Sequence, residues 1–133
     1  MLTISASTLR RVLLLDAGSG LAMGLSHFLL ADALSEWTGV PDAWLRVAAV
    51  IVFGAATLAA WLAARGSTPP AGVRLLAAGN FGWVAASVWL VFGAGLSLTS
   101  LGVFWVLAQA VVVLVLAELE WAGADRRRAL TPA

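Results

Sequence analysis

Residues Leu9 to Leu34 read LRRVLLLDAGSGLAMGLSHFLLADAL, a stretch long enough and apolar enough to cross a lipid bilayer. The same stretch contains Asp16, several glycines and His27, the only histidine of the chain. Polar side chains inside a membrane are energetically costly, so they usually mark a packing contact or a functional site. We therefore expect a membrane-spanning helix whose polar side faces protein and not lipid.

The composition of the whole chain also indicates an integral membrane protein. Of its 133 residues 62% are hydrophobic and only 11% are charged, and a single soluble domain of this size cannot bury so much apolar surface. The net charge is +1 and lysine is absent, which argues against a nucleic-acid partner. The absence of cysteine excludes thiol catalysis, thiolate metal sites and disulfides, and with one histidine we expect no metal site.

Four segments have the length of a membrane-spanning helix: residues 9–34, 44–64, 73–92 and 98–121. The segments between them are short and rich in Gly and Pro, which is typical of turns between antiparallel neighbours. The prediction is an all-α membrane protein with one domain, residues 1–133, folded as an up-down bundle of four transmembrane helices. Residues 122–133 are expected to form a short basic cytoplasmic tail.

The distribution of arginines predicts the orientation in the membrane. Only Arg46 falls on one side of the predicted bundle, and the other arginines fall on the opposite side: Arg10, Arg11, Arg65, Arg74, Arg126, Arg127 and Arg128. By the positive-inside rule, both termini of this multi-pass protein are cytoplasmic.

The two halves of the chain are similar to each other. Residues 12–65 pair with residues 73–126 without a gap, and the identical pairs include Gly18 with Gly79, Ser26 with Ser87, and Trp44 with Trp105. This pattern predicts two tandem helical hairpins related by a parallel repeat, with the axis along the membrane normal. In this pairing Ala77 stands opposite Asp16 and Val88 opposite His27, so the titratable groups of the first helix belong to the first copy alone.

Asp16 and His27 are eleven positions apart and so share one face of the first helix, about 16 Å apart along its axis. One interpretation is a polar path or pocket with a titratable group toward each end. In the other interpretation, Asp16 is stabilised by the helix dipole and the nearby arginines, while His27 donates to a backbone carbonyl. The sequence leaves both open.

The later spans carry further polar side chains. Asn80 and Ser87 share a face of the third span, and Gln109 lies near the middle of the fourth. Because an amide inside a membrane needs a hydrogen-bond partner, we expect a polar seam in the cytoplasmic half. Its expected members are Asp16, Ser19, Asn80 and Gln109. The seam is either a site for a small ligand or ion, or a structural contact between helices.

Two other patterns indicate packing and surface ion pairs. Gly20 and Gly24 form a GxxxG motif, which predicts close helix packing within the bundle or across a dimer. Glu118 and Glu120 lie near the arginines that end the last helix, so we expect interfacial ion pairs there. Arg46 is expected to pair with Asp42 or Glu36.

A diffuse series of residues supports a family resemblance: Leu9-Arg10-Arg11, Asp16-Ala17, Gly20, Leu45-Arg46, Asn80, Trp83, Ser87, Leu101-Gly102, Gln109-Ala110 and Glu118-Leu119-Glu120. The series resembles a group of small, uncharacterised four-helix integral membrane proteins of bacteria. The resemblance covers nearly the whole chain and implies this fold and the bacterial inner membrane. It implies no activity.

No nucleophile with its base, phosphate-binding loop or metalloprotease motif occurs, so the expected function is non-enzymatic. The first hypothesis is a homodimer that binds or transports a small ligand or ion along the polar stripe of the first and third spans. The alternative is an accessory or scaffolding subunit whose polar seam is structural. A second alternative is haem or quinone binding through His27, although one histidine supplies only one axial ligand; otherwise no cofactor is predicted.

Overall fold

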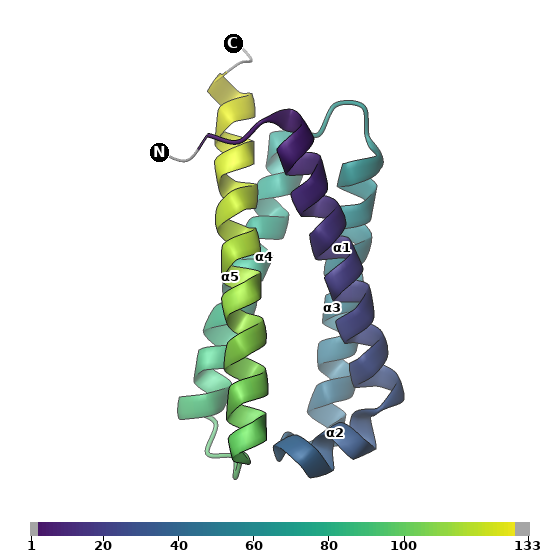
Figure 1. Cartoon of the computed structure of the whole chain (residues 1–133), viewed down its shortest axis with the longest axis vertical. Helices are drawn as coiled ribbons and strands as arrows, with labels where there is room; N and C mark the ends of the chain where they lie inside the picture. Colours follow the sequence, from purple (N-terminus) through teal and green to yellow (C-terminus); the bar gives the residue numbers. More distant parts are fainter. Residues whose placement is uncertain (1–2, 130–133) are drawn as a thin grey trace.

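The computed structural model describes residues 3–129, with side chains described as far as Arg126. It contains five helices and, in these residues, no strand (Figure 1). The helices are α1 (Ala6–Leu29), α2 (Ala31–Thr38), α3 (Asp42–Ala64), α4 (Pro70–Phe92) and α5 (Ser100–Ala129). All except α2 are long and apolar enough to span a membrane. The predicted class, an all-α bundle with four membrane-spanning helices in a multi-pass protein, is confirmed.

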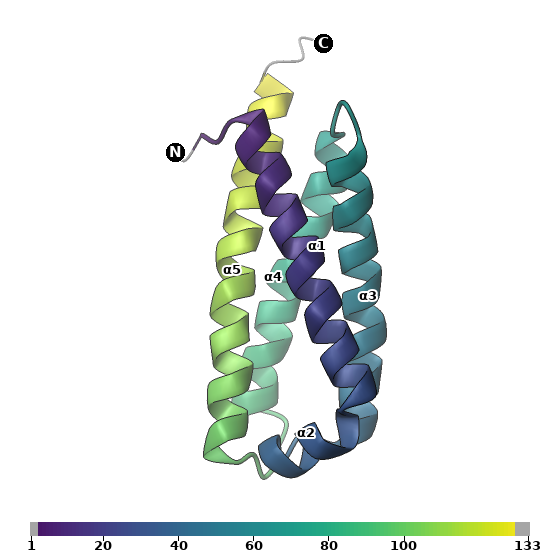
Figure 2. The ribbon, with the colours of Figure 1, turned by 45° about the vertical axis from the view of Figure 1, so that its right-hand side comes forward.

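The long helices run up and down and form two hairpins. The start of α1 and the end of α5 lie with the α3–α4 connection at one end of the bundle, whereas α2 and the α4–α5 connection lie at the other (Figures 1 and 2). We call these the terminal end and the α2 end. α1 packs mainly along α3, and α4 mainly along α5. In the gapless pairing of the two halves, α2 stands opposite residues 92–99, of which only Phe92 is helical, so the tandem repeat stays a prediction.

The starts of two helices follow from their sequences. At α1, the Ser5 hydroxyl accepts a hydrogen bond from the backbone N–H of Thr8 at 3.0 Å, which is the usual N-cap arrangement. At α4, Pro70 stands in the first turn, where its missing N–H leaves no hydrogen bond unmade. Both starts lie at the terminal end and fix where the chain enters the bundle.

The first helix is shorter than predicted. The sequence prediction ran from Leu9 to Leu34, but α1 ends at Leu29, and Leu30 (φ −113°, ψ 21°) turns the chain into the separate helix α2. The physical reason is the polarity of the last predicted turn, because Asp32 is more favourable outside the hydrocarbon core than in a continued span. The first connection is therefore a short helix across the end of the bundle.

The end of α2 packs closely against the start of α5. Gly39 ends α2 with φ 78°, a conformation that glycine adopts without strain. A Cβ on Gly102 would overlap the carbonyl oxygen of Thr38, so α5 approaches α2 only because this position is glycine. The same carbonyl accepts a hydrogen bond from the backbone N–H of Thr99 at 3.0 Å, and the Thr99 hydroxyl donates to the Trp37 carbonyl at 2.6 Å. These contacts join the two hairpins at the α2 end.

The last helix is longer than predicted. α5 continues to Ala129, so residues 122–129 form its final turns and not a separate tail. Arginines in the last turns of a helix complement the negative end of its dipole, which favours this extension. The side chains of Arg127 and Arg128 and residues 130–133 lie outside the described residues, so the predicted basic tail is described only in part.

Two apolar clusters form the core of the bundle. The cluster at the terminal end consists of Leu9, Leu13, Ala59, Leu62, Ala63, Val73, Leu76 and Ala124, and the cluster at the α2 end of Ala31, Leu34, Val40, Leu45 and Val106. The GxxxG motif acts within the bundle, because Gly20 packs on Ala56 of α3 and Gly24 on the ring of Phe53. Large apolar side chains such as Leu15, Leu75 and Phe104 are exposed on the outside, where they contact the lipid.

Candidate functional site

Three buried polar side chains meet between α1, α4 and α5, and we call them the carboxyl cluster. They are Asp16, Asn80 and Glu120, whose exposed fractions are 7%, 6% and 0%. The side-chain nitrogen of Asn80 donates to Asp16 Oδ2 at 3.1 Å and to Glu120 Oε2 at 3.0 Å. One amide group therefore links two carboxyl groups from the two hairpins.

The carboxyl cluster lies deep in the membrane-spanning part of the bundle. Asp16 and Asn80 are each ten residues beyond the first residue of their helix, or about 15 Å along the axis. The apolar cluster with Leu13, Leu62 and Val73 lies between this level and the terminal end, and these three side chains are fully buried. Toward the other side, Asp16 and Asn80 line a cavity of about 110 Å³, which we call the small cavity.

No described basic side chain pairs with the carboxyl cluster. Arg74 of α4 forms an ion pair with Asp125 of α5 and lies 5.6 Å from the centroid of the Trp121 ring. Arg74 and Asp125 are each more than one helical turn nearer the terminal end than Asn80 and Glu120. The second carboxyl oxygen of Glu120, Oε1, is buried without a hydrogen-bond partner. The cluster therefore contains more acceptors than donors.

A second polar group, which we call the amide cluster, lies within the α4–α5 hairpin. The indole N–H of Trp83 donates to Gln109 Oε1 at 2.7 Å, and Gln109 Nε2 donates to the Ser87 hydroxyl at 3.0 Å and to the Val106 carbonyl at 2.8 Å. The Ser87 hydroxyl donates in turn to the Trp83 carbonyl at 2.8 Å. Every side chain of this cluster has a partner.

The predicted polar seam is therefore divided between two levels of the bundle. Asp16 and Asn80 meet as expected, but Gln109 does not join them, because it lies eleven residues before Glu120, or about 16 Å along α5. Ser19 does not join them either: it is exposed, and its hydroxyl donates to the backbone carbonyl of Asp16 at 3.2 Å.

Glu120 is the member of the site that the sequence analysis assigned wrongly. An interfacial ion pair with the terminal arginines was expected, but the side chain is fully buried and bonded to Asn80. The cause is the length of α5, which continues nine residues past Glu120 and places it well inside the bundle. The available signal was the helical face that Glu120 shares with Gln109, eleven positions earlier. Glu118 is exposed, and no ion pair to it occurs among the described residues.

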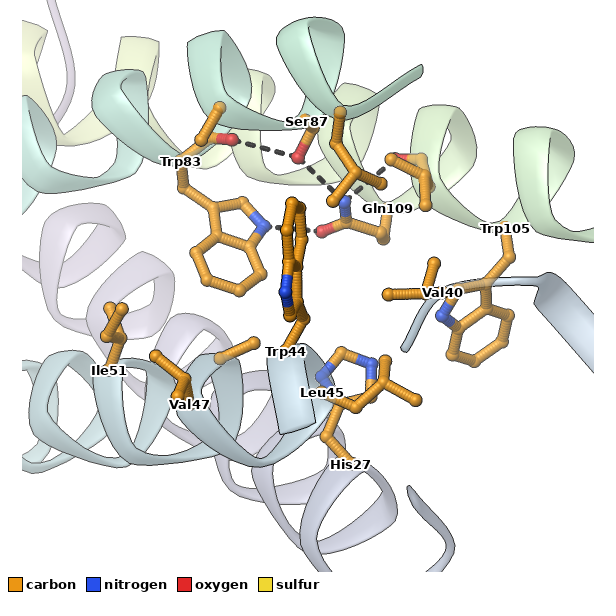
Figure 3. A pocket seen from close by; sticks show the side chains of 14 residues that line it. His27, Val40, Trp44, Leu45, Val47, Ile51, Trp83, Ser87, Trp105 and Gln109 are labelled. Atoms are coloured by element: carbon orange, nitrogen blue, oxygen red, sulfur yellow. Dashed lines mark hydrogen bonds between the residues drawn. The ribbon is translucent and has the colours of Figure 1, made fainter. Parts of the chain in front are cut away.

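His27 lines a larger cavity, of about 390 Å³, between α3 and the α4–α5 hairpin; we call it the side cavity. Figure 3 shows side chains of α1 and α3 on one side of it and those of α4 and α5 on the other. His27 is 5% exposed, and neither ring nitrogen has a hydrogen-bond partner. The expectation that His27 donates to a backbone carbonyl is therefore wrong.

The walls of the side cavity are aromatic and apolar. Trp44, Trp83 and Trp105 line it (Figure 3), and Trp44 stacks on Trp89 of α4 with ring centroids 6.1 Å apart. Val47 and Ile51 of α3 also line the cavity, although their side chains are more than half exposed on the outer surface. The cavity therefore opens sideways, toward the lipid.

The two cavities are neighbours. Trp83 and Ile51 line both the small cavity and the side cavity. The hydrogen bond from the indole of Trp83 to Gln109 holds that ring in place. Trp83 therefore lies between the level of His27 and the level of the carboxyl cluster.

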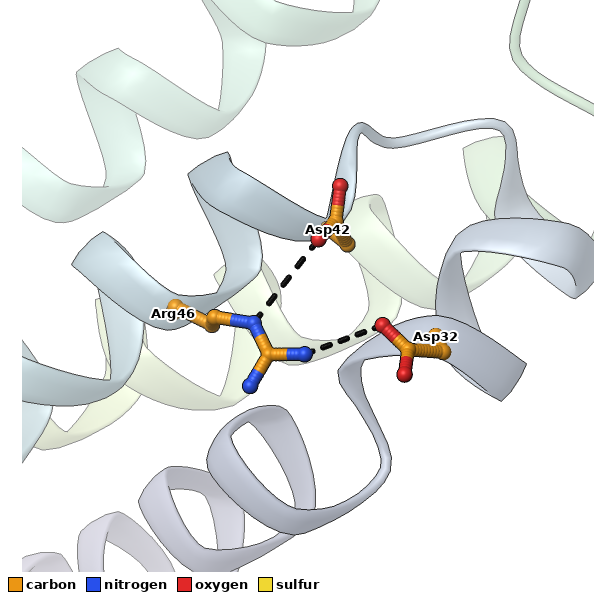
Figure 4. Close-up of polar contacts among 3 residues, drawn as sticks. All are labelled: Asp32, Asp42 and Arg46. Carbon is orange, nitrogen blue, oxygen red and sulfur yellow. Dashed lines mark hydrogen bonds and ion pairs between the residues drawn. The ribbon is translucent and has the colours of Figure 1, made fainter.

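The exposed ion pairs at the α2 end are structural. Arg46 of α3 pairs with Asp32 of α2 at 2.9 Å and with Asp42 at 3.7 Å (Figure 4), whereas the sequence indicated Asp42 or Glu36. All three side chains are substantially exposed, and such pairs contribute about 0–1 kcal/mol. They attach α2 to α3.

Comparison with models of protein families, with curated proteins and with solved structures found no match to this chain. Of what the bacterial four-helix resemblance implied, the four long apolar helices are confirmed.

Proposed function

We propose that this protein binds a small lipophilic molecule in the side cavity, with His27 as its hydrogen-bond partner. The observation that carries the proposal is the state of His27, which is buried and has both ring nitrogens unpartnered. A buried polar group without a partner is energetically unfavourable, so its presence calls for a compensating role. A ligand in the side cavity would supply the missing partner.

The shape of the side cavity supports a ligand with a flat head group. Small-molecule sites have volumes of about 300–1,000 Å³ and are mostly apolar with a few polar groups. The side cavity, at about 390 Å³, lies at the lower end of this range. Three indole rings in its walls favour stacking with an aromatic or conjugated ring. The opening between α3 and α4 lets a hydrocarbon tail remain in the bilayer.

The chemistry of His27 narrows the ligand class. A neutral imidazole has one N–H donor and one acceptor nitrogen, so it can donate to a carbonyl oxygen of the ligand. Quinones combine a conjugated ring, carbonyl oxygens and a lipid-soluble tail, and they are the class that fits best. Haem remains the competing ligand, and the absorbance spectrum of the purified protein separates the two, because bound haem gives a Soret band.

Orientation and membrane are part of the proposal. Arg10, Arg65, Arg74 and Arg126 lie at the terminal end, and Arg46 lies at the α2 end. The positive-inside rule then supports both termini in the cytoplasm, and the bacterial inner membrane is the one that the sequence resemblance implies. The predicted homodimer stays a prediction; Gly20 and Gly24 are already used in packing α1 on α3.

The alternative, a scaffolding subunit with purely structural polar contacts, is favoured by the amide cluster. Its donors and acceptors satisfy one another within one hairpin and need no ligand. His27, in contrast, has no hydrogen-bond partner on either ring nitrogen. A test of ligand binding at His27 therefore separates the two functions.

The test is a titration of the protein in lipid nanodiscs with a short-chain ubiquinone, followed by quenching of tryptophan fluorescence. We expect saturable quenching, and we expect His27→Phe to raise the Kd roughly 2- to 10-fold, the equivalent of one hydrogen bond of about 0.5–1.5 kcal/mol. Leu29→Phe, a change on the lipid-facing surface of the same helix, is the matched control and should leave the Kd unchanged. The proposal would be refuted if the quenching did not saturate, or if His27→Phe and Leu29→Phe had the same Kd.

A further inference from the structure

We propose that Asp16 and Glu120 hold one proton between them, so that the carboxyl cluster is a proton-binding site inside the membrane. This inference is independent of the ligand in the side cavity. It rests on the geometry of the cluster, on the charged groups around it and on one unpartnered oxygen.

The two carboxyl groups are close together. Both accept from the same nitrogen of Asn80, at 3.1 and 3.0 Å, so the two accepting oxygens are no farther apart than the sum of these distances, about 6 Å. Two negative charges at this separation repel each other, and in a site away from water the repulsion is weakly screened. Carboxyl pairs of this kind resolve the conflict by sharing one proton.

Among the side chains that the structure describes, no basic group pairs with the carboxyl cluster. On α4, Arg74 is already paired with Asp125, and on α5, Arg126 donates to the Ile4 carbonyl at 2.8 Å at the terminal end. On α1, Arg10 donates to the Ala63 carbonyl at 3.1 Å at the terminal end, and His27 lies about 16 Å away along the helix. On α3, the side chains that line the small cavity are aliphatic: Ile51, Val52, Ala55 and Ala56. Neutralisation therefore has to come from a bound cation.

The unpartnered oxygen indicates where that cation binds. Glu120 Oε1 is buried without a partner, although Glu120 is the fully buried member of the cluster. Among three side chains with two carboxyl groups, only Asn80 supplies donor hydrogens. A proton on either carboxyl group adds one O–H donor, which can bridge the acid and the carboxylate. The proton thus reduces the excess of acceptors as well as the charge.

The donor set favours a proton over a metal ion. No group of three or more His, Cys, Asp or Glu side chains that could hold a metal occurs among the described residues. Asn80 also turns its N–H donors, and not its carbonyl oxygen, toward both carboxyl groups. Amide hydrogens in that position would repel a metal cation, whereas they stabilise a carboxylate that shares a proton.

Access to the site is through the small cavity. Asp16 and Asn80 line it, and Asn80 is hydrogen-bonded to Glu120. Toward the terminal end, the fully buried side chains of Leu13, Leu62 and Val73 separate the cluster from the solvent. In the proposed exchange, a proton delivered through the small cavity forms an O–H bond with a carboxylate oxygen of Asp16 and leaves by the same way.

The experiment is infrared spectroscopy of the protein in nanodiscs, which resolves the C=O stretch of a protonated carboxylic acid from the bands of carboxylates. We expect this acid band near neutral pH, a shift of the band in D₂O, and its loss at alkaline pH. Asp16→Asn and Glu120→Gln should each change the band, and the double variant should abolish it. Glu118→Gln, an exposed carboxyl two residues from Glu120, should leave it unchanged.

Two outcomes would overturn the inference. The first outcome is that the wild-type protein shows no acid band and is thermally stabilised by Na⁺ but not by choline. The site would then bind a sodium ion and not a proton. The other is a band that survives unchanged in the double variant, which would place the proton elsewhere. If the substituted proteins fail to fold, the pH titration of the wild-type protein in H₂O and D₂O tests the inference instead. A site in which both carboxyl groups are ionised gives no acid band near neutral pH.

Discussion

The carboxyl cluster is buried and the amide cluster is partly buried, and both are polar, but their hydrogen bonding differs. In the amide cluster, Trp83, Ser87 and Gln109 satisfy one another inside the α4–α5 hairpin. In the carboxyl cluster, one amide links carboxyl groups of the two hairpins and one oxygen has no partner. A satisfied network inside a hairpin stabilises it, whereas an unsatisfied network between hairpins is suited to binding and to change.

The largest expected effect is at Asn80. Replacing it by Leu removes both hydrogen bonds to the carboxyl groups and leaves Asp16 and Glu120 facing each other without a donor. Hydrogen bonds to charged groups contribute about 1.5–3 kcal/mol each, so the free energy of unfolding should fall by about 3 kcal/mol or more. The measurement is reversible unfolding in mixed detergent micelles.

Ala78→Leu is the matched control for Asn80→Leu, because it adds the same side chain to α4 at an exposed position. It should change the free energy of unfolding by less than about 0.5 kcal/mol. Equal effects of the two substitutions would mean that Asn80 does not hold the hairpins together.

A smaller effect is expected at Gln109. Gln109→Met keeps the length of the side chain but removes the acceptor of Trp83 and the donor to Ser87. Interhelical hydrogen bonds in membranes contribute about 0.6–2 kcal/mol, so the free energy of unfolding should fall by about 1–2 kcal/mol. The acid band of the carboxyl cluster should stay unchanged, and Val111→Met, at a lipid-facing position, is the control. A loss as large as that of Asn80→Leu would remove the distinction between the clusters.

The sequence predicted the fold better than the site, for physical reasons. Segment length and hydropathy are enough to predict the membrane-spanning helices. Asp16 and Asn80 could be assigned to a buried contact because few other polar side chains lie near the middle of α1 and α4. The third partner could not be assigned in the same way. The choice between Gln109 and Glu120 as that partner depends on where α5 ends. The arginines after residue 125 indicated a helix end close to Glu120, whereas α5 continues to Ala129.

The break after Leu29 was missed for a related reason. The apolar run continues through Leu30 and Ala31 as far as Asp32, so the polarity that ends the span does not mark the residue at which the helix stops. That residue is set by α2 packing on α3 and α5. The side cavity could not be predicted at all. It depends on how the indoles of Trp44 and Trp83 are placed between helices that are distant in sequence.

The smallest effect, and the one of opposite sign, is expected at His27. His27→Phe replaces a buried imidazole without partners by an apolar ring of similar shape, and the adjoining cavity leaves room for the difference in size. Removing an unsatisfied buried polar group is favourable by about 1 kcal/mol, so the ligand-free variant should be slightly more stable than the wild type in the same unfolding assay. A structural histidine predicts the reverse, because its loss would break a hydrogen bond as Gln109→Met does. If His27→Phe gains stability while its affinity for the quinone falls, His27 is a ligand-binding residue. If the variant loses stability and its affinity for the quinone is unchanged, the role of His27 is structural.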